Sequence, residues 1–238
     1  MQLQPEQEPL MYRILATALA LLCLATSAHA MSFNKAIKQA DPTAKYLFYL
    51  HGAIVEEMGK AASSKRYGVY NYDRIIEHFE DRGLTVIDEV RGKVNPNKYA
   101  AKITKQVRML MTAGVPARNI TVSGFSKGGY ITLLVASSLN NPEVGYVIMA
   151  GCGRGKDARP FELFLKNKRG ARLKGRIFSI YASSDMEAGS CRPAIEQADA
   201  RAIEFRETRI KSQKGHGLFY QPRPDWIEPT AIFAKGGR

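Results

Sequence analysis

Two hydrophobic patterns alternate along the chain from residue 44 onward. The first is a short, nearly continuous apolar run, which is typical of a strand buried on both faces of a parallel sheet. The second places apolar residues three and four positions apart, on one face of a helix. The strand-like runs are 44–50, 84–90, 119–123, 145–150, 176–182 and 204–210, and the helix-like segments are 72–82, 97–113, 127–140, 160–168, 193–202 and 225–235.

This alternation predicts the fold class. Strands that alternate with helices build a parallel sheet with helices packed on both faces, and the chain contains no internal repeat or linker. We therefore expect an α/β protein, a three-layer sandwich around a mostly parallel six-stranded sheet in a single domain. Segment 53–71 is rich in Gly and Ser and predicts a long loop, and loops of this length in compact domains are usually functional.

The first thirty residues follow a different pattern. Arg13 precedes an apolar run at 14–25, and Ala28 and Ala30 supply the small residues of an A-x-A cleavage site. The run is too short for a membrane-spanning helix. We interpret residues 1–30 as a secretory signal peptide cleaved near Ala30, rather than as a membrane anchor.

Cleavage there would release residues 31–238 as an exported protein, periplasmic or secreted. Residues 1–10 are acidic and rich in Gln, unlike the start of a signal peptide, which makes Met11 an alternative start of translation. The whole chain is 45% hydrophobic and 24% charged, a balance that excludes a disordered chain and an integral membrane protein.

The charge balance is strongly basic. The chain has a net charge of +13, and loss of residues 1–30, with one Arg and two Glu, raises it to +14. Such a charge favours anionic surfaces such as acidic lipids and cell-wall polymers. The basic residues are scattered, however, apart from a local concentration at 166–176. We therefore expect at most weak association with an anionic envelope surface, and no nucleic-acid partner.

The strongest candidate for chemistry follows the third strand-like run. Gly124-Phe125-Ser126-Lys127-Gly128 fits G-x-S-x-G, the strand-to-helix turn that exposes a nucleophilic serine. Such a turn needs neighbours without Cβ atoms, because the serine backbone is strained and the helix packs close to the strand. The alternative interpretation is an ordinary Gly-rich turn between a strand and a helix.

A nucleophilic serine needs a base, and three histidines lie outside residues 1–30. His78 lies within the amphipathic segment 72–82, which favours a packed or half-exposed helical residue. His51 ends the first strand-like run. His216 lies between two glycines after the last strand-like run, in a loop that can reach Ser126, and is our candidate base. The alternative for His216 is a solvent-exposed loop residue.

The base in turn needs an acid to orient it. Asp185 directly follows the strand-like run 176–182, and its place at the end of a strand favours it for this role. Asp157, in a basic loop, and Glu187, two residues further on, are the competing carboxylates. Aspartate is also common in turns as a local cap, which is the alternative for Asp185.

The order Ser126, Asp185, His216 resembles that of the α/β-hydrolase superfamily. The resemblance covers nearly all of 31–238 and implies a minimal member of that fold, without a large lid. Gly-Phe-Ser-Lys-Gly-Gly is similar to the Gly-Phe-Ser-Gln-Gly-Gly turn of small carboxylesterases and acyl thioesterases. Lys127 and the segment 53–57 depart from that subfamily, so we assign none.

The resemblance also implies roles for further residues. The backbone N–H groups of Lys127 and Ala53 would form the oxyanion hole, and His51 would orient its loop rather than act as a second base. Gly52, Gly124 and Gly128 would support the two loops. The Lys127 side chain either turns outward or attracts a carboxylate or phosphate of the substrate.

Two cysteines remain outside residues 1–30, Cys152 and Cys191. They follow consecutive strands, and in an exported protein we expect them to form a disulfide that braces the loop of Asp185. The alternative is a pair of reduced thiols. Two cysteines without a CxxC motif or a nearby histidine make no metal-ligand set, and the expected chemistry requires no cofactor.

Together these residues predict a serine hydrolase that cleaves a carboxylic ester or thioester of a small or lipid-like molecule through an acyl-enzyme at Ser126. The loop 53–71 is expected to cover the acyl pocket. Because the fold and a triad do not determine the reaction, a peptidase or a lyase with the same triad is an alternative. A second alternative is a non-catalytic protein that binds the envelope through its basic surface.

Overall fold

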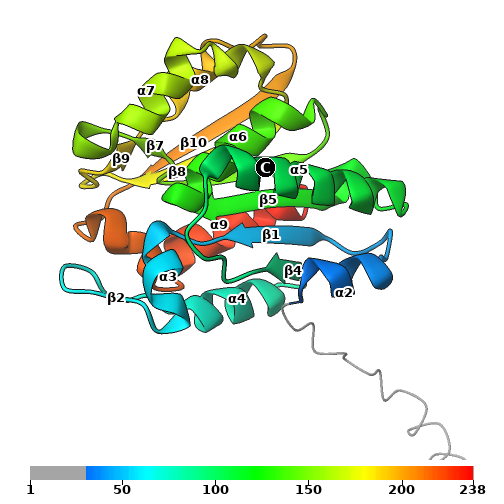
Figure 1. Ribbon diagram of the computed structural model, residues 1–238, viewed down its shortest axis with the longest axis horizontal. Coiled ribbons are helices and arrows are strands. Elements are labelled where there is room, and N and C mark those ends of the chain that lie inside the picture. Colours follow the sequence, from blue (N-terminus) through cyan, green and yellow to red (C-terminus); the bar gives the residue numbers. More distant parts are fainter. Residues whose placement is uncertain (1–30, 238) are drawn as a thin grey trace, which may run out of the picture.

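A single parallel sheet organises the molecule. The computed structural model describes residues 31–237, so the predicted signal peptide lies outside the described residues. Six strands pair in the order β4–β1–β5–β6–β8–β10, and every pair is parallel, which confirms the predicted sheet (Figure 1). The strands are β1 (Tyr46–Leu50), β4 (Thr85–Asp88), β5 (Ile120–Phe125), β6 (Gly145–Met149), β8 (Gly175–Ala182) and β10 (Ile203–Ile210).

The strand order reverses direction next to β1. The chain moves outward from β1 to β4, then returns to place β5 on the other side of β1. At such a switch point the loops that leave two adjacent strands diverge, and a crevice opens beyond their carboxyl ends. The register pairs Leu50 with Gly124, so β1 and β5 end side by side.

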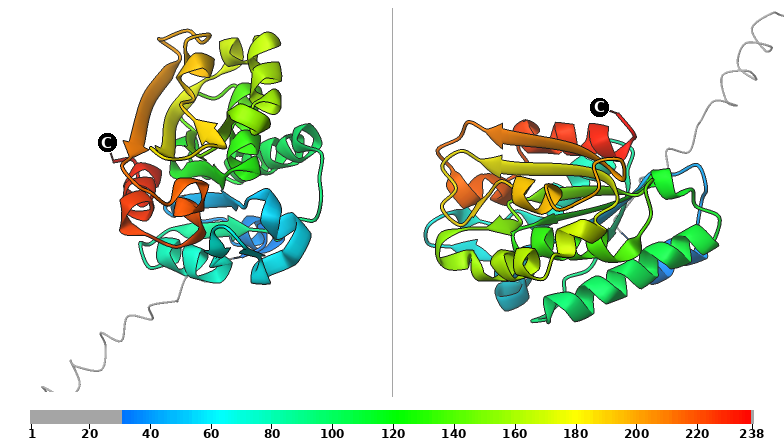
Figure 2. Two further views of the ribbon diagram at one scale, coloured as in Figure 1. Left: turned by 90° about the vertical axis from the view of Figure 1, so that its left-hand side faces the viewer. Right: turned by 90° about the horizontal axis from the view of Figure 1, so that it is seen from above.

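Helices cover both faces of the sheet, as Figure 2 shows in the view from above, with α5 and α9 on opposite sides. Alternate side chains of β1 enter two separate cores: Tyr46, Phe48 and Leu50 on one face, Leu47 and Tyr49 on the other. The first core contains residues of α2 (Phe33–Lys38), α5 (Pro96–Thr112), α6 (Lys127–Leu139), α7 (Arg159–Lys166) and α8 (Arg192–Ile195); the second contains residues of α3 (Ala53–Met58), α4 (Tyr72–Glu80) and α9 (Pro224–Ala234).

The segment 53–71 is more ordered than the predicted loop. It contains α3, a 3-10 turn (Gly59–Ala61) and a two-stranded antiparallel hairpin of β2 (Ser63–Ser64) and β3 (Gly68–Val69). The hairpin closes where the Tyr70 N–H donates to the Ala62 carbonyl at 2.8 Å, and both residues are buried. Elements this short carry too few residues for a hydrophobic period to show in the sequence.

The predicted helix 193–202 is also shorter than expected. Helix α8 ends at Ile195, and the carboxylate of Asp199 accepts the Arg201 N–H at 3.0 Å. This local side-chain bond competes with helical hydrogen bonding and makes a turn before β10. Among residues 31–237, every helix falls short of the length or apolarity needed to cross a membrane.

Cys152 and Cys191 form a disulfide, as the sequence predicts, with their Cα atoms 5.3 Å apart. Cys152 belongs to β7 (Cys152–Gly153), which pairs antiparallel with β9 (Ala188–Gly189). The bond therefore ties the loop after β6 to the loop after β8. By restricting the unfolded chain, a crosslink across 39 residues contributes about 3–4 kcal/mol to stability.

Candidate active site

Ser126 occupies a strained turn between β5 and α6. Its φ of 55° and ψ of −118° are rare for a residue with a side chain, and such strain persists only where surrounding contacts enforce it. Two backbone hydrogen bonds do so: the Ser126 N–H donates to Met149 O, and Ser126 O accepts the Tyr130 N–H, both at 2.9 Å. The turn is therefore held in the conformation that exposes a serine hydroxyl.

The glycines of the motif are required by close packing of α6 on the sheet. A Cβ atom added to Gly128 would lie 1.9 Å from the carbonyl oxygen of Leu50, and one added to Gly124 would lie 2.3 Å from the carbonyl oxygen of Gly128. Gly52 is less tightly enclosed, with the Phe125 ring 3.1 Å from its added Cβ. Backbone packs directly on backbone here, so the first turn of α6 lies against the end of the neighbouring strand β1.

Asp185 and His216, the candidate acid and base of the sequence analysis, lie in direct contact in the structure. The Nδ1 atom of His216 lies 2.9 Å from Oδ2 of Asp185, whose side chain is fully buried. The other carboxylate oxygen accepts the N–H groups of Glu187 and Ala188, at 2.8 and 3.1 Å. Both carboxylate oxygens are therefore occupied, and Nε2 of His216 is the ring nitrogen without a hydrogen bond to another described residue.

Packing keeps the His216 ring in place. His216 lies in a 3-10 turn (Gly215–Tyr220), and its ring centroid is 4.8 Å from that of Phe125. Ser184 ties this turn to the loop of Asp185, since its Oγ accepts the Gly215 N–H at 3.1 Å and donates to Ser212 O at 2.6 Å. The loops after β8 and β10 thus position the acid and the base together.

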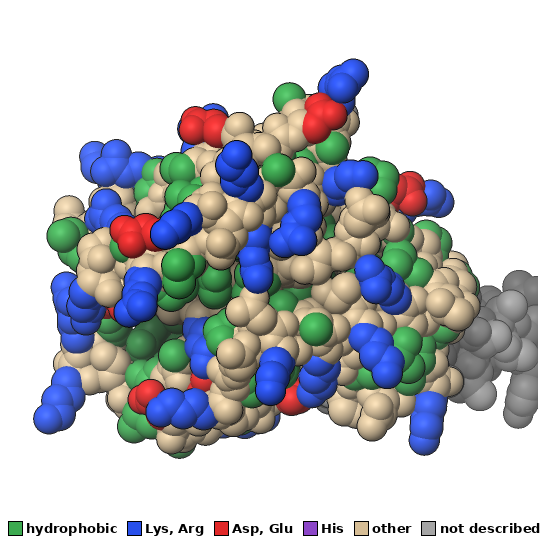
Figure 3. Space-filling view, turned by 45° about the horizontal axis from the view of Figure 1, so that its top comes forward, with side chains coloured by type: hydrophobic (Ala, Val, Ile, Leu, Met, Phe, Trp, Pro, Cys, Tyr) green, Lys and Arg blue, Asp and Glu red, His purple; other side chains and the backbone are tan. Residues whose placement is uncertain are grey.

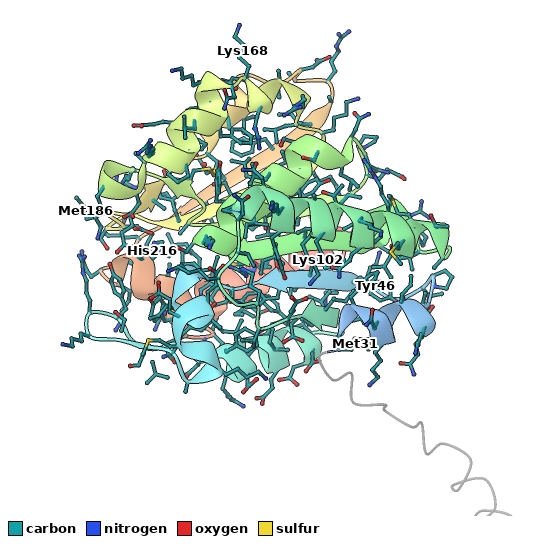
Figure 4. All side chains as sticks on the ribbon, viewed as in Figure 1. Met31, Tyr46, Lys102, Lys168, Met186 and His216 are labelled. Atoms are coloured by element: carbon teal, nitrogen blue, oxygen red, sulfur yellow. A yellow bond between two sulfur atoms is a disulfide. The ribbon has the colours of Figure 1, made fainter. Side chains whose placement is uncertain are left out.

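Ser126 and His216 line one cavity of about 560 Å³. The arrowhead of β1 in Figure 1 marks the carboxyl end of the sheet. In Figure 4, His216 and Met186 lie at this end, and Tyr46 lies toward the other end. The lining consists of Ala53, Pro96, Ser126, Lys127, Tyr130, Ala150, Gly151, Gly153, Lys156, Asp157, Pro160, Phe161, Glu187 and His216.

Ala53 and Lys127, the two residues expected to form an oxyanion hole, both line this cavity. Ala53 is the first residue of α3 and Lys127 the first residue of α6. The first N–H groups of a helix have no carbonyl within the helix to which they can donate. Both amides are therefore without a hydrogen-bond acceptor inside their own helix.

His51 lies in the short loop between β1 and α3. It is buried, and both of its ring nitrogens have a hydrogen-bond partner. The Arg91 N–H donates to its Nε2 at 3.0 Å, and its Nδ1 lies 2.9 Å from Gly52 O. Because Nε2 accepts, the proton must reside on Nδ1 and the ring must be neutral. Burial first, and then the positive charge of Arg91, lowers the pKa of His51 to about 3.

A buried ion network connects His51 to the turn of Ser126. The Arg91 guanidinium donates to His51 O and, at 2.8 Å, to Oε1 of Glu56. The Lys127 ammonium donates to Oε2 of Glu56 at 2.5 Å and to Val94 O at 2.9 Å. With their side chains only 1% and 2% exposed, Arg91 and Glu56 leave no uncompensated charge, because each has a partner of opposite sign.

Comparisons with known proteins agree on the architecture. No protein-family model matches the sequence, and no curated protein matches it. Solved structures do. SOBER1 of Arabidopsis thaliana superposes with a TM-score of 0.53 at 11% identity, over 82% of this chain and 99% of that one. A monoacylglycerol lipase of Paleococcus ferrophilus superposes with a TM-score of 0.53 at 13% identity, over 82% and 96%. The chain has the α/β-hydrolase fold.

A larger protein contains the same fold. Dipeptidyl peptidase 4 of Porphyromonas gingivalis superposes with a TM-score of 0.55 at 16% identity over 83% of this chain, which spans only 32% of that protein. At such identities the comparison shows the fold alone.

Within the α/β-hydrolase fold, the structure brings Ser126, Lys127, Ala53 and His216 to one cavity, with Asp185 behind His216. Asp157 lies exposed on the cavity rim, and His78 lies half-buried on α4.

Sequence reasoning missed the network roles of Arg91 and Glu56, because neither belongs to a motif. Among residues 31–237, the His, Cys, Asp and Glu side chains make no group of three that could hold a metal ion.

Proposed function

We propose that this chain is a serine hydrolase that cleaves a carboxylic ester or thioester. One observation carries the proposal: the buried Asp185 holds His216 by Nδ1, and His216 shares a cavity with Ser126 in its strained turn. A hydroxyl, a base with one free nitrogen and an orienting acid are the groups that acyl transfer requires.

The mechanism assigns one step to each group. His216 Nε2 takes the proton of the Ser126 hydroxyl as its oxygen attacks the substrate carbonyl. The N–H groups of Lys127 and Ala53 stabilise the oxyanion of the tetrahedral intermediate, an effect worth about 3–4 kcal/mol for one such donor. His216 then gives the proton to the leaving alcohol or thiol, and an acyl group remains on Ser126. Water, activated by His216, releases the acid.

The solved structure described as a monoacylglycerol lipase supports the choice of an ester bond. The cavity supports it as well, because its volume admits a small acyl group together with a leaving group. The peptidase named above has the same fold, but this chain covers only 32% of its length. We therefore rank amide cleavage below ester cleavage.

We further propose that the protein acts outside the cytoplasm, after removal of residues 1–30. The disulfide between Cys152 and Cys191 supports this location, because such bonds persist in oxidising compartments. Lys and Arg side chains are spread over the visible face of the molecule rather than gathered in one patch (Figure 3). This distribution supports a soluble enzyme whose contact with anionic surfaces is weak.

A fluorophosphonate probe tests the assignment of the nucleophile. We expect the probe to label the wild-type protein at Ser126, and labelling and hydrolysis of short p-nitrophenyl esters to vanish in Ser126→Ala. Ser138→Ala, at an exposed position on the same helix, is the matched control and should be labelled like the wild type. Labelling that persists in Ser126→Ala, with an unchanged melting temperature, would show that another residue is the nucleophile.

A further inference from the structure

Glu187 lies beside the nitrogen of His216 that Asp185 does not use. Its Oε2 is 3.8 Å from Nε2 of His216, and its side chain lines the cavity with 24% of its surface exposed. The two carboxylates therefore occupy opposite ends of the imidazole ring. From the sequence, Glu187 is an alternative to Asp185 as the orienting acid. In the structure it lies on the side of the His216 ring that faces the cavity.

Tyr67 holds this carboxylate in place. The hydroxyl of Tyr67, in the turn between β2 and β3, donates to Oε1 of Glu187 at 2.6 Å. Burial, followed by the contact with Glu187, raises the pKa of Tyr67, so its hydroxyl remains a donor. The backbone N–H of Glu187 is bound to Asp185 at 2.8 Å. With one oxygen and the backbone engaged, Oε2 remains directed toward His216.

Among the charged side chains that line the cavity, Glu187 is the one that contacts His216. Among the charged residues that line the cavity, Lys127 is already bound to Glu56. Lys156 and Asp157 have opposite charges, are adjacent in the sequence and are exposed, so they largely offset one another in water. Glu187 is more enclosed and lies nearest to the reacting nitrogen, where its charge is least screened.

We infer that Glu187 forms an anionic subsite for a leaving group that carries a positively charged nitrogen. This inference rests on the proposed function: if Nε2 of His216 protonates the leaving group, that group lies within a few ångströms of the Glu187 carboxylate. A cationic amino alcohol is attracted there, and a carboxylate or phosphate is repelled. The substrate class is thus an ester of an amino alcohol, although the protein as a whole is basic.

Two esters of the same shape and different charge test the subsite. Acetylcholine and 3,3-dimethylbutyl acetate differ by one positive charge at the leaving-group end. We expect the wild-type protein to prefer the choline ester by about tenfold in kcat/KM, which corresponds to about 1.4 kcal/mol. In Glu187→Gln the ratio should fall toward one. Asp157→Asn, which removes the same charge at the cavity rim, is the matched control and should keep the wild-type ratio.

Each result has a defined meaning. A wild-type ratio near one, or a ratio that Glu187→Gln leaves unchanged, overturns the subsite while leaving the serine hydrolase intact. If neither ester is cleaved and no phosphonate label is taken up, the proposed function fails. Calorimetric titration with choline then decides the subsite by itself: binding to the wild type that Glu187→Gln weakens about tenfold supports it, and equal or absent binding overturns it.

Discussion

His51 and His216 invite comparison because their local sequences are so similar. Each follows a strand of the same sheet, adjoins glycine and is buried near Ser126. They differ in their partners. His51 has a backbone group at each ring nitrogen, whereas His216 has Asp185 at Nδ1 and the cavity at the other end of the ring. A free ring nitrogen therefore distinguishes the proposed base, His216, from His51, and burial does not.

The two histidines also stabilise different parts of the site. His51 and Arg91 connect the loop after β1 to the loop after β4, and Glu56 with Lys127 extends the connection to the turn of Ser126. His216 depends on the loops after β8 and β10, which Ser184 joins. One side of Ser126 is therefore held by a buried ion network, and the other by hydrogen bonds between two loops and by a disulfide.

Removal of His216 should have the largest effect on activity. We expect His216→Ala to lower kcat/KM for a p-nitrophenyl ester by about 10³–10⁴-fold, the contribution of a positioned general base and acid. His78→Ala, on α4, is the control and should retain full activity. Retention of most activity in His216→Ala would contradict the contrast between the two histidines.

Removal of Arg91 should affect stability on the His51 side. In Arg91→Met, Glu56 loses one of its two cationic partners and His51 O loses a donor, both in buried surroundings. We expect a loss of about 3–5 kcal/mol in the free energy of unfolding, measured by urea denaturation. Arg108→Met, an exposed position on α5, should change it by less than about 0.5 kcal/mol. Equal losses in the two variants would show that the buried network adds nothing to stability.

Between pH 6.5 and 4.5, the smallest expected effect is the pH dependence of stability due to His51. In the folded protein its pKa is about 3, whereas in the unfolded chain it takes up a proton below about pH 6.5. The unfolded state therefore binds more protons at acidic pH, and stability present above pH 6.5 falls by about 1.4 kcal/mol per pH unit toward pH 3. His51→Gln should have a lower slope between pH 6.5 and 4.5. Identical slopes would mean that His51 is not held neutral.

Much of this architecture follows from the hydrophobic pattern. The six strand-like runs correspond to the six strands of the sheet, because strands buried on both faces are nearly continuous in apolar residues. Ser126, Asp185 and His216 follow three of these strands, and the carboxyl ends of parallel strands meet at one edge. Their proximity in the structure is therefore a consequence of topology, which the sequence reveals.

The rest of the site depends on pairings that the sequence does not show. Glu56 meets Arg91, 35 residues away, and Lys127, 71 residues away, and no periodic pattern relates these positions. Whether a lysine after the serine turns outward or inward depends on a distant carboxylate. In the same way, Glu187 and Asp185 are only two residues apart, and their opposite positions around His216 depend on the packing of Tyr67.

The β2–β3 hairpin is closed at its base, so the residues within it can be replaced by another short segment. Ala62 and Tyr70 are buried and bonded to each other, so the residues between them leave and rejoin the fold at nearly the same point. The Tyr67 ring fills the space beside Gly217, where an added Cβ would approach it to 2.7 Å. Replacement of this short segment would therefore change the residue that holds Glu187, and it would leave the pairing of the six-stranded sheet intact. Loop grafting at this segment is therefore a route to new substrate preferences.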